Sequence, residues 1–128
     1  MHTIRLRGPW QIAALISENP TTGEIEIPGD WGTVFGSEFA GPARFTRRFG
    51  LPTNLTNERV TLVIEQIRGA GSIALNGVPL GEQSEGDGAR RYEITALLKL
   101  RNVLEIAVQA SGQPAGGIGE VRLEIEVS

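Results

Sequence analysis

Residues 73–81 read IALNGVPLG, and this stretch places a tight turn between two apolar segments. Ile73 and Leu75 alternate with smaller residues before Asn76-Gly77, and an apolar stretch resumes after the pair. A two-residue type I′ turn needs positive φ at both central positions, which asparagine and glycine adopt most easily. The stretch therefore predicts a β-hairpin in which Asn76 and Gly77 have a structural role.

The same period of two recurs along most of the chain and indicates β-strands. The alternating segments are residues 22–31, 43–52, 59–67, 71–77, 102–109 and 120–127. We expect a polar loop at residues 82–91 and one short helical turn capped by Thr95. About eight strands with Gly- and Pro-rich punctuation predict an all-β fold, a two-sheet antiparallel β-sandwich of jelly-roll topology. An immunoglobulin-type sandwich is the alternative, although its Cys-Trp-Cys pattern is absent.

The length and composition favour one globular domain over residues 1–128. The chain has no cysteine, which excludes disulfides, thiolate metal sites and a cysteine nucleophile. The formal net charge is -3 and the basic residues are scattered, so we expect no nucleic-acid partner. We find no signal peptide and no apolar run of about 20 residues, so we expect no membrane partner and leave the localisation unknown, with the cytoplasm as the default.

Several longer segments carry a family pattern in a fixed order. These segments are LRGPW (6–10), IPGDW (27–31), FAGPARFTRRFGLP (39–52), RVTLVIEQIRGAGSIALNGVPLG (59–81), YEITALLKLRNVLEIAV (92–108) and GGIGEVRLEIEV (116–127). The set resembles the N-terminal sugar-binding domain of family 2 glycoside hydrolases, which include β-galactosidases, β-glucuronidases and β-mannosidases. The resemblance covers roughly residues 6–126 and implies a galactose-binding-domain-like β-sandwich.

The sequence departs from this family at positions that matter for function. Arg44 stands where the family usually has tryptophan, and Arg90 stands where an aromatic residue precedes the Asp-Ile-Thr element. The catalytic carboxylates of the family lie on a separate (β/α)₈ barrel of about 250 residues, which these 128 residues cannot hold. We therefore assign no catalytic residue and expect that the chain is not an enzyme by itself.

Aromatic residues are the first candidates for sugar binding. Sugar rings expose C–H patches that pack on flat aromatic faces, while polar groups around them fix the orientation. Trp10, Trp31 and Tyr92 could provide such faces, and we take Trp31 and Tyr92 as candidate ligand-binding residues. The alternative is that these side chains belong to the core, because only seven aromatic residues must fill a whole sandwich.

Arginines are the second group of candidates. Arg44, Arg90 and Arg91 could donate paired hydrogen bonds to hydroxyls or to the carboxylate of an acidic sugar. The alternative is a solvated surface or structural ion pairs. Arg47 alternates with two phenylalanines, so we expect it to share their face and to need a partner, for which Glu65 is a candidate.

Metal and carboxylate chemistry find little support. His2 is the only histidine, which excludes a histidine-based triad and a site with several histidines. The loop EQSEGDG (82–88) has oxygen ligands for calcium but lacks the EF-hand spacing, so a structural calcium ion is not indicated and we expect no cofactor. Acidic pairs such as Glu124 and Glu126 are expected to be solvated on an outer strand face.

Three hypotheses follow for function. The leading one is a non-catalytic carbohydrate-binding module, related to glycoside hydrolases, that prefers acidic sugars. The second is a protein-interaction or accessory β-sandwich that has lost sugar binding, which the arginine departures favour. The third is a truncated piece of a complete glycoside hydrolase.

Overall fold

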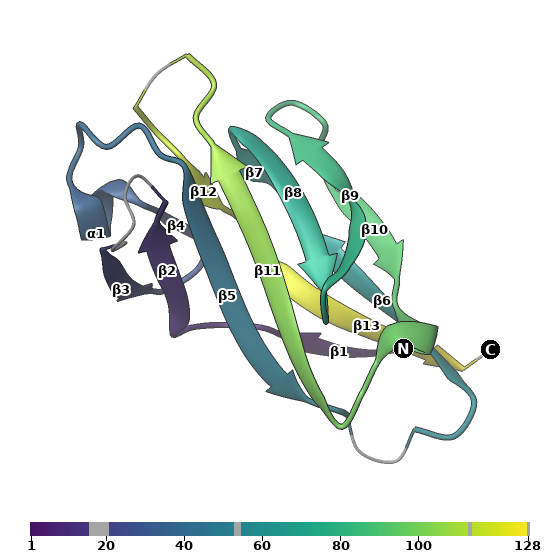
Figure 1. The fold of residues 1–128 in the computed structure, drawn as a ribbon. Coiled ribbons are helices and arrows are strands. Elements are labelled where there is room, and N and C mark those ends of the chain that lie inside the picture. Colours follow the sequence, from purple (N-terminus) through teal and green to yellow (C-terminus); the bar gives the residue numbers. More distant parts are fainter. Residues whose placement is uncertain (16–20, 53–54, 113, 128) are drawn as a thin grey trace.

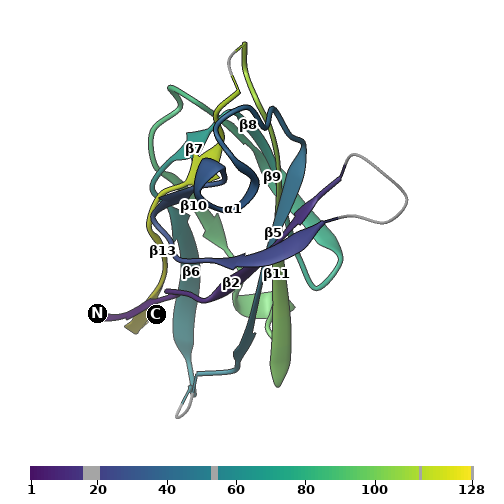
Figure 2. The ribbon, with the colours of Figure 1, turned by 90° about the vertical axis from the view of Figure 1, so that its left-hand side faces the viewer.

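The structure is a computed structural model that describes residues 1–15, 21–52, 55–112 and 114–127. Two antiparallel sheets pack face to face, and a small third sheet closes one end of the sandwich beside a short helix (Figures 1 and 2). The predicted all-β, two-sheet sandwich is therefore confirmed.

The larger sheet has six strands in the order β3-β2-β5-β11-β8-β9. They are β3 (Thr22–Ile25), β2 (Trp10–Ala14), β5 (Ala43–Gly50), β11 (Arg101–Gln109), β8 (Ala70–Leu75) and β9 (Val78–Ser84). Phe45 in β5 and Ile106 in β11 point into the core, whereas their neighbours Arg44 and Glu105 lie on the outer face. This alternation is the cause of a dry inner face and a polar outer face.

The second sheet has four strands in the order β1-β13-β6-β10. They are β1 (His2–Arg5), β13 (Val121–Val127), β6 (Glu58–Ile64) and β10 (Arg90–Glu93). The third sheet joins β4 (Gly29–Asp30), β12 (Gly117–Ile118) and β7 (Ile67–Arg68), and the helices are α1 (Gly32–Phe35) and the 3₁₀ helix η1 (Thr95–Leu97). Because β1 pairs with β13, the two ends of the chain lie side by side (Figure 2).

The predicted hairpin at Asn76-Gly77 is confirmed. Leu75 pairs with Val78 across the turn, and φ is 52° at Asn76 and 81° at Gly77, as a type I′ turn requires. The Asn76 side chain also accepts a hydrogen bond from the backbone N–H of Val103 at 2.9 Å. The turn is thus attached to the start of β11 and is not an isolated loop tip.

A buried asparagine holds the same end of the sandwich together. Asn102 is 1% exposed, and its Oδ1 accepts hydrogen bonds from the Lys99 N–H at 2.9 Å and from Asn76 Nδ2 at 3.0 Å. Its Nδ2 donates to the carbonyl oxygens of Lys99 at 2.9 Å and Phe49 at 3.4 Å. One side chain therefore links the hairpin turn, the loop before β11 and the end of β5.

The structure differs from the sequence-based prediction in three places. The segment 82–91 is a loop only in its middle, because β9 continues to Ser84 and β10 begins at Arg90. Thr95 is not a helix cap: its hydroxyl accepts a hydrogen bond from the Val60 N–H at 2.9 Å, and Ile94 precedes η1. The described part of the chain forms thirteen strands where we expected about eight, since several pairings involve only two residues.

Candidate functional site

The two tryptophans are core residues. Trp10 and Trp31 are both 0% exposed, and their indole N–H groups donate to the carbonyl oxygens of Leu6 at 2.7 Å and Phe39 at 3.0 Å. A Cβ atom at Gly116 would lie 2.4 Å from the Trp31 ring, so the backbone closes directly over the indole. The expectation that Trp31 offers a stacking face to a ligand is therefore wrong in this structure.

Tyr92 is half-buried on the inner side of β10. Its hydroxyl donates to Gln83 Oε1 at 3.3 Å, and the Gln83 side chain, which is fully buried, donates to the carbonyl oxygen of Ile64 at 2.9 Å. Burial raises the pKa of the Tyr92 hydroxyl, partly offset by the nearby charge of Arg90. Tyr92 thus joins β10 to β9 through its hydroxyl group.

Arg90 and Arg91 are engaged in ion pairs on the four-stranded sheet. Arg90 lies 3.2 Å from Asp87, and Arg91 Nη2 lies 2.5 Å from Glu124 Oε1. Asp87 also accepts a hydrogen bond from the Ser84 N–H, which is the main reason that its pKa is lowered. Both guanidinium groups therefore already have carboxylate partners.

Arg122 is the centre of the ion-pair network on this sheet. It contacts Glu65, Glu120 and Glu124, the last at 2.9 Å between Nε and Oε2. Hydrogen bonds from Arg91 and then Arg122 lower the pKa of the Glu124 carboxyl, against the opposing effect of burial. The expected solvated position of Glu124 is therefore wrong, because that side chain is nine-tenths buried between two arginines.

Arg47 and Glu65 do not form the pair that we expected. Arg47 Nε donates to the carbonyl oxygen of Arg7 at 2.8 Å, and its Nη1 donates to the carbonyl oxygen of Arg48. Glu65 pairs with Arg122 instead. Arg47 thus binds backbone carbonyl oxygens and not the carboxylate of Glu65.

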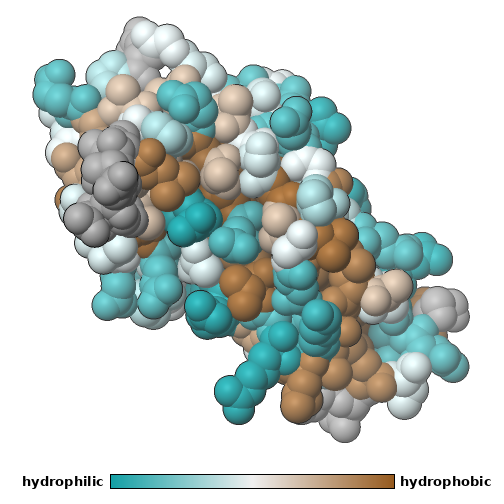
Figure 3. Space-filling model, in the orientation of Figure 1, coloured by the Kyte–Doolittle hydropathy of each residue, from teal (hydrophilic) through white to brown (hydrophobic). Residues whose placement is uncertain are grey.

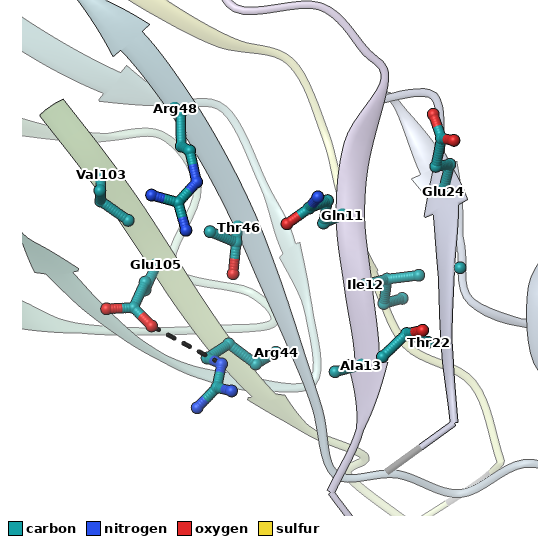
Figure 4. Close-up of a pocket in the computed structure, with 11 residues that line it drawn as sticks. Gln11, Ile12, Ala13, Thr22, Glu24, Arg44, Thr46, Arg48, Val103 and Glu105 are labelled. Atoms are coloured by element: carbon teal, nitrogen blue, oxygen red, sulfur yellow. Dashed lines mark ion pairs between the residues drawn. The ribbon is translucent and has the colours of Figure 1, made fainter. Parts of the chain in front are cut away.

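The candidate site is a shallow hollow on the outer face of the six-stranded sheet. It measures about 650 Å³ and lies over β3, β2, β5 and β11 (Figure 4). Its lining consists of Gln11, Ile12, Ala13, Thr22, Gly23, Glu24, Arg44, Thr46, Arg48, Val103 and Glu105. Of the predicted ligand-binding residues, only Arg44 lies here.

Strand register explains how the polar groups of the hollow come together. Gln11, Thr46 and Glu105 stand side by side across β2, β5 and β11, because Thr46 pairs with Gln11 on one side and with Glu105 on the other. Neighbouring strands lie about 4.8 Å apart, so these three side chains form a continuous polar row. In Figure 4 the Gln11 amide is turned toward Thr46.

Two arginines flank this row on β5. Arg44 Nε lies 3.6 Å from Glu105 Oε2, a long ion pair between two partly exposed side chains. Arg48 is exposed, and its guanidinium lies beside Thr46 in Figure 4. Over the described ranges Arg48 forms no ion pair with a carboxylate. Arg48 is not among the site residues predicted from the sequence, although its position four residues after Arg44 on one alternating strand puts both on the same face.

Metal-ligating side chains do not cluster in the described part of the chain: no group of three or more histidine, aspartate or glutamate side chains is placed to hold an ion. Asp87, in the segment that we considered for calcium, accepts a hydrogen bond from the Ser84 N–H and forms an ion pair with Arg90. No helix among the described residues has the length and apolar character to cross a membrane.

No sequence-family model and no curated protein matches the chain, but solved structures of several glycosidases contain a domain with this fold. The match to a β-glucuronidase from Bifidobacterium dentium, complexed with coumarin-3-O-glucuronide, covers 99% of this chain and 30% of that enzyme. The sequence identity is 16% and the TM-score is 0.83. The match to a family 2 β-galacturonidase from Eisenbergiella tayi covers 99% of this chain and 24% of that enzyme, at 17% identity and a TM-score of 0.82. The match to a protein described as a β-galactosidase from Bacteroides fragilis covers 97% of this chain and 23% of that protein, at 18% identity and a TM-score of 0.79.

This chain corresponds in structure to one part of each of those enzymes. The chain spans less than a third of the length of the three, and the matched region is their N-terminal β-sandwich domain. The described residues contain strands and two short helices, with no (β/α)₈ barrel. The fold of this chain is therefore that of the N-terminal β-sandwich domain of family 2 glycoside hydrolases.

Proposed function

We propose that this chain is a non-catalytic carbohydrate-binding module and that the hollow over β2, β5 and β11 is its binding surface. The observation that carries the proposal is the row of Gln11, Thr46 and Glu105 between two arginines, on a sheet face that nothing in the described structure covers. The likeness in fold to sugar-cleaving enzymes supports the choice of carbohydrate as the ligand class.

The chemistry of the hollow suits a sugar. An amide, a hydroxyl and a carboxylate offer both donors and acceptors, and sugar hydroxyls need both. Small side chains such as Ala13 leave room for a ring above the sheet. Since none of the described residues that line it is aromatic, stacking contributes nothing and binding should be weak.

An oligosaccharide titration with paired variants tests this proposal. Gln11→Ala and Thr46→Val each remove a polar group from the hollow, while Thr61→Val makes the same change on the outer face of the other sheet. We expect the first two to weaken binding of neutral and acidic oligosaccharides at least threefold, and Thr61→Val to leave it unchanged. Equal affinities for all three variants would refute the hollow as the binding surface.

A protein-interaction role is the second candidate, because apolar side chains are exposed at one end of the sandwich. Leu51, Val78 and Leu100 are 37%, 42% and 78% exposed, and the Leu51 N–H donates to the Leu100 carbonyl oxygen at 2.9 Å. Figure 3 shows hydrophobic surface at the end that carries the β8–β9 turn. Exposed apolar groups of this kind mark interaction surfaces in many proteins.

Sedimentation of Leu100→Ser beside the unmodified chain separates the two candidates. If this end binds protein, the unmodified chain should associate with itself or with an added glycosidase catalytic domain, and Leu100→Ser should abolish the association. If the chain sediments as a monomer, does not bind the added catalytic domain and binds oligosaccharides, the protein-interaction role is refuted.

The chain is equally consistent with a place inside a complete glycoside hydrolase, where it would be the N-terminal β-sandwich. In that setting we propose that the hollow contacts sugar units outside the reacting bond. The genomic reading frame around the chain distinguishes the settings, because a complete hydrolase continues into a barrel of about 250 residues.

A further inference from the structure

We propose that the hollow selects acidic sugars, with the carboxylate of a uronic acid bound by Arg48; the inference rests on the proposed carbohydrate-binding function. The starting point is the difference between Arg48 and the other arginines that we considered. Arg90 and Arg91 have carboxylate partners at 3.2 and 2.5 Å, whereas Arg48 has none among the residues that the structure describes. A guanidinium binds a carboxylate with two parallel hydrogen bonds, and Arg48 is free to do so.

The position of Arg48 directs its charge toward the hollow. In β5 the side chain lies on the same face as Thr46 and pairs in register with Val103 of β11. Figure 4 shows its guanidinium between Val103 and Thr46. A carboxylate on Arg48 would therefore place the ring hydroxyls of the same sugar over the Thr46 hydroxyl and the Gln11 amide.

The formal charges that line the hollow sum to zero, so any preference for an anion is local to Arg48. Arg44 and Arg48 bring two positive charges, and Glu105 neutralises one of them through its contact with Arg44. Glu24 lies on β3, and in Figure 4 its carboxylate points away from the other charged groups. Among the described residues that line the hollow, Arg48 is the cation without an ion pair, which supports a local preference for a carboxylate but not tight binding.

The spacing of the two arginines fits a chain of sugars better than a single ring. Arg44 and Arg48 are four residues apart on one strand, which corresponds to about 13 Å at about 3.3 Å per residue. Glu105 also borders a second depression of about 380 Å³ over β8 and β9, whose other lining residues are mostly small or apolar. An acidic oligosaccharide lying along β5 would span the distance between Arg48 and Arg44.

This arrangement predicts opposite effects for two substitutions. Arg48→Gln removes the free positive charge and should weaken binding of acidic oligosaccharides about three- to tenfold, and that of neutral ones by a smaller factor. Glu105→Gln removes a repelling carboxylate and releases Arg44, so it should strengthen acidic binding about three- to tenfold. Arg90→Gln, on the other sheet, loses the same charge as Arg48→Gln and serves as the matched control.

Calorimetric titrations with oligogalacturonate, oligoglucuronate and neutral oligogalactose test the proposal at low and high salt. Circular dichroism confirms that each variant is folded. The expected result is an acidic preference that high salt weakens and that Arg48→Gln, but not Arg90→Gln, removes. Equal binding of acidic and neutral oligomers, or an unchanged preference in Arg48→Gln, would overturn selection by Arg48 and leave carbohydrate binding intact. No binding of any oligomer would refute both proposals.

Discussion

Replacing Asn102 by alanine should destabilise the protein by about 2–3 kcal/mol. The side chain makes three hydrogen bonds of 3.0 Å or less, two to the Lys99 backbone and one from Asn76 Nδ2. Each contributes about 1 kcal/mol net, and the loss is largest where a buried group is left without a partner. Asn76 Nδ2 keeps the Leu97 carbonyl oxygen at 3.0 Å, so the third bond should cost less than the other two.

This loss is a large part of the 5–15 kcal/mol that stabilises a typical domain. For 128 residues the unfolding entropy is about 0.27 kcal/mol/K, so the melting temperature should fall by about 7–11 °C. Urea unfolding can be followed by the fluorescence of Trp10 and Trp31, because both rings are fully buried. Gln109→Ala, an exposed amide on the same strand, is the control and should change stability by less than about 0.5 kcal/mol. If Asn102→Ala were no more destabilising than this control, the link between turn, loop and strand would be refuted.

Three further predictions concern the turn, the ion-pair network and catalysis. Gly77→Val should destabilise the protein by roughly 1 kcal/mol or more, because φ is 81° at this position. The cost is purely conformational, since no atom lies within 4 Å of an added Cβ. An unchanged melting temperature would contradict it. Glu124→Gln should cost about 2 kcal/mol at pH 7. Because the pKa of Glu124 in the folded protein lies below 4.5, this stabilisation is present above about pH 4.5 and is lost as the pH falls through the folded pKa. The free energies of unfolding in urea of the two proteins should therefore converge in acid. A difference that stays constant with pH would count against the ion-pair network. The chain should not hydrolyse aryl glycosides, and turnover that survives repurification and disappears on substitution of one carboxylate would overturn this prediction.

The sequence predicts the fold because its signals are local. Positive φ at Asn76-Gly77 follows from two adjacent residues, and the strands follow from alternation within single segments. The burial of Trp31 was harder to foresee, since it depends on Gly41 and Gly116 leaving space for the ring from distant parts of the chain. Composition alone shows two tryptophans but not which face each one occupies.

The candidate site depends on strand order, which the local patterns do not contain. Alternation along β5 is enough to put Arg44, Thr46 and Arg48 on the outer face. Gln11 and Glu105 join them only because β2 and β11 are the neighbours of β5 in the sheet. The pairing of Arg91 with Glu124 likewise requires β6 to lie between β10 and β13, so it could not be distinguished from a free ligand-binding arginine.

The most direct test of the carbohydrate-binding hollow is a titration of the backbone amide NMR spectrum with oligogalacturonate. We expect saturable shifts that centre on Gln11, Thr46, Arg48 and Glu105, on three adjacent strands of the six-stranded sheet. Amide signals on β10, including that of Arg91, should remain in place. Shifts confined to β10, or a spectrum that does not respond to any oligosaccharide, would contradict the account.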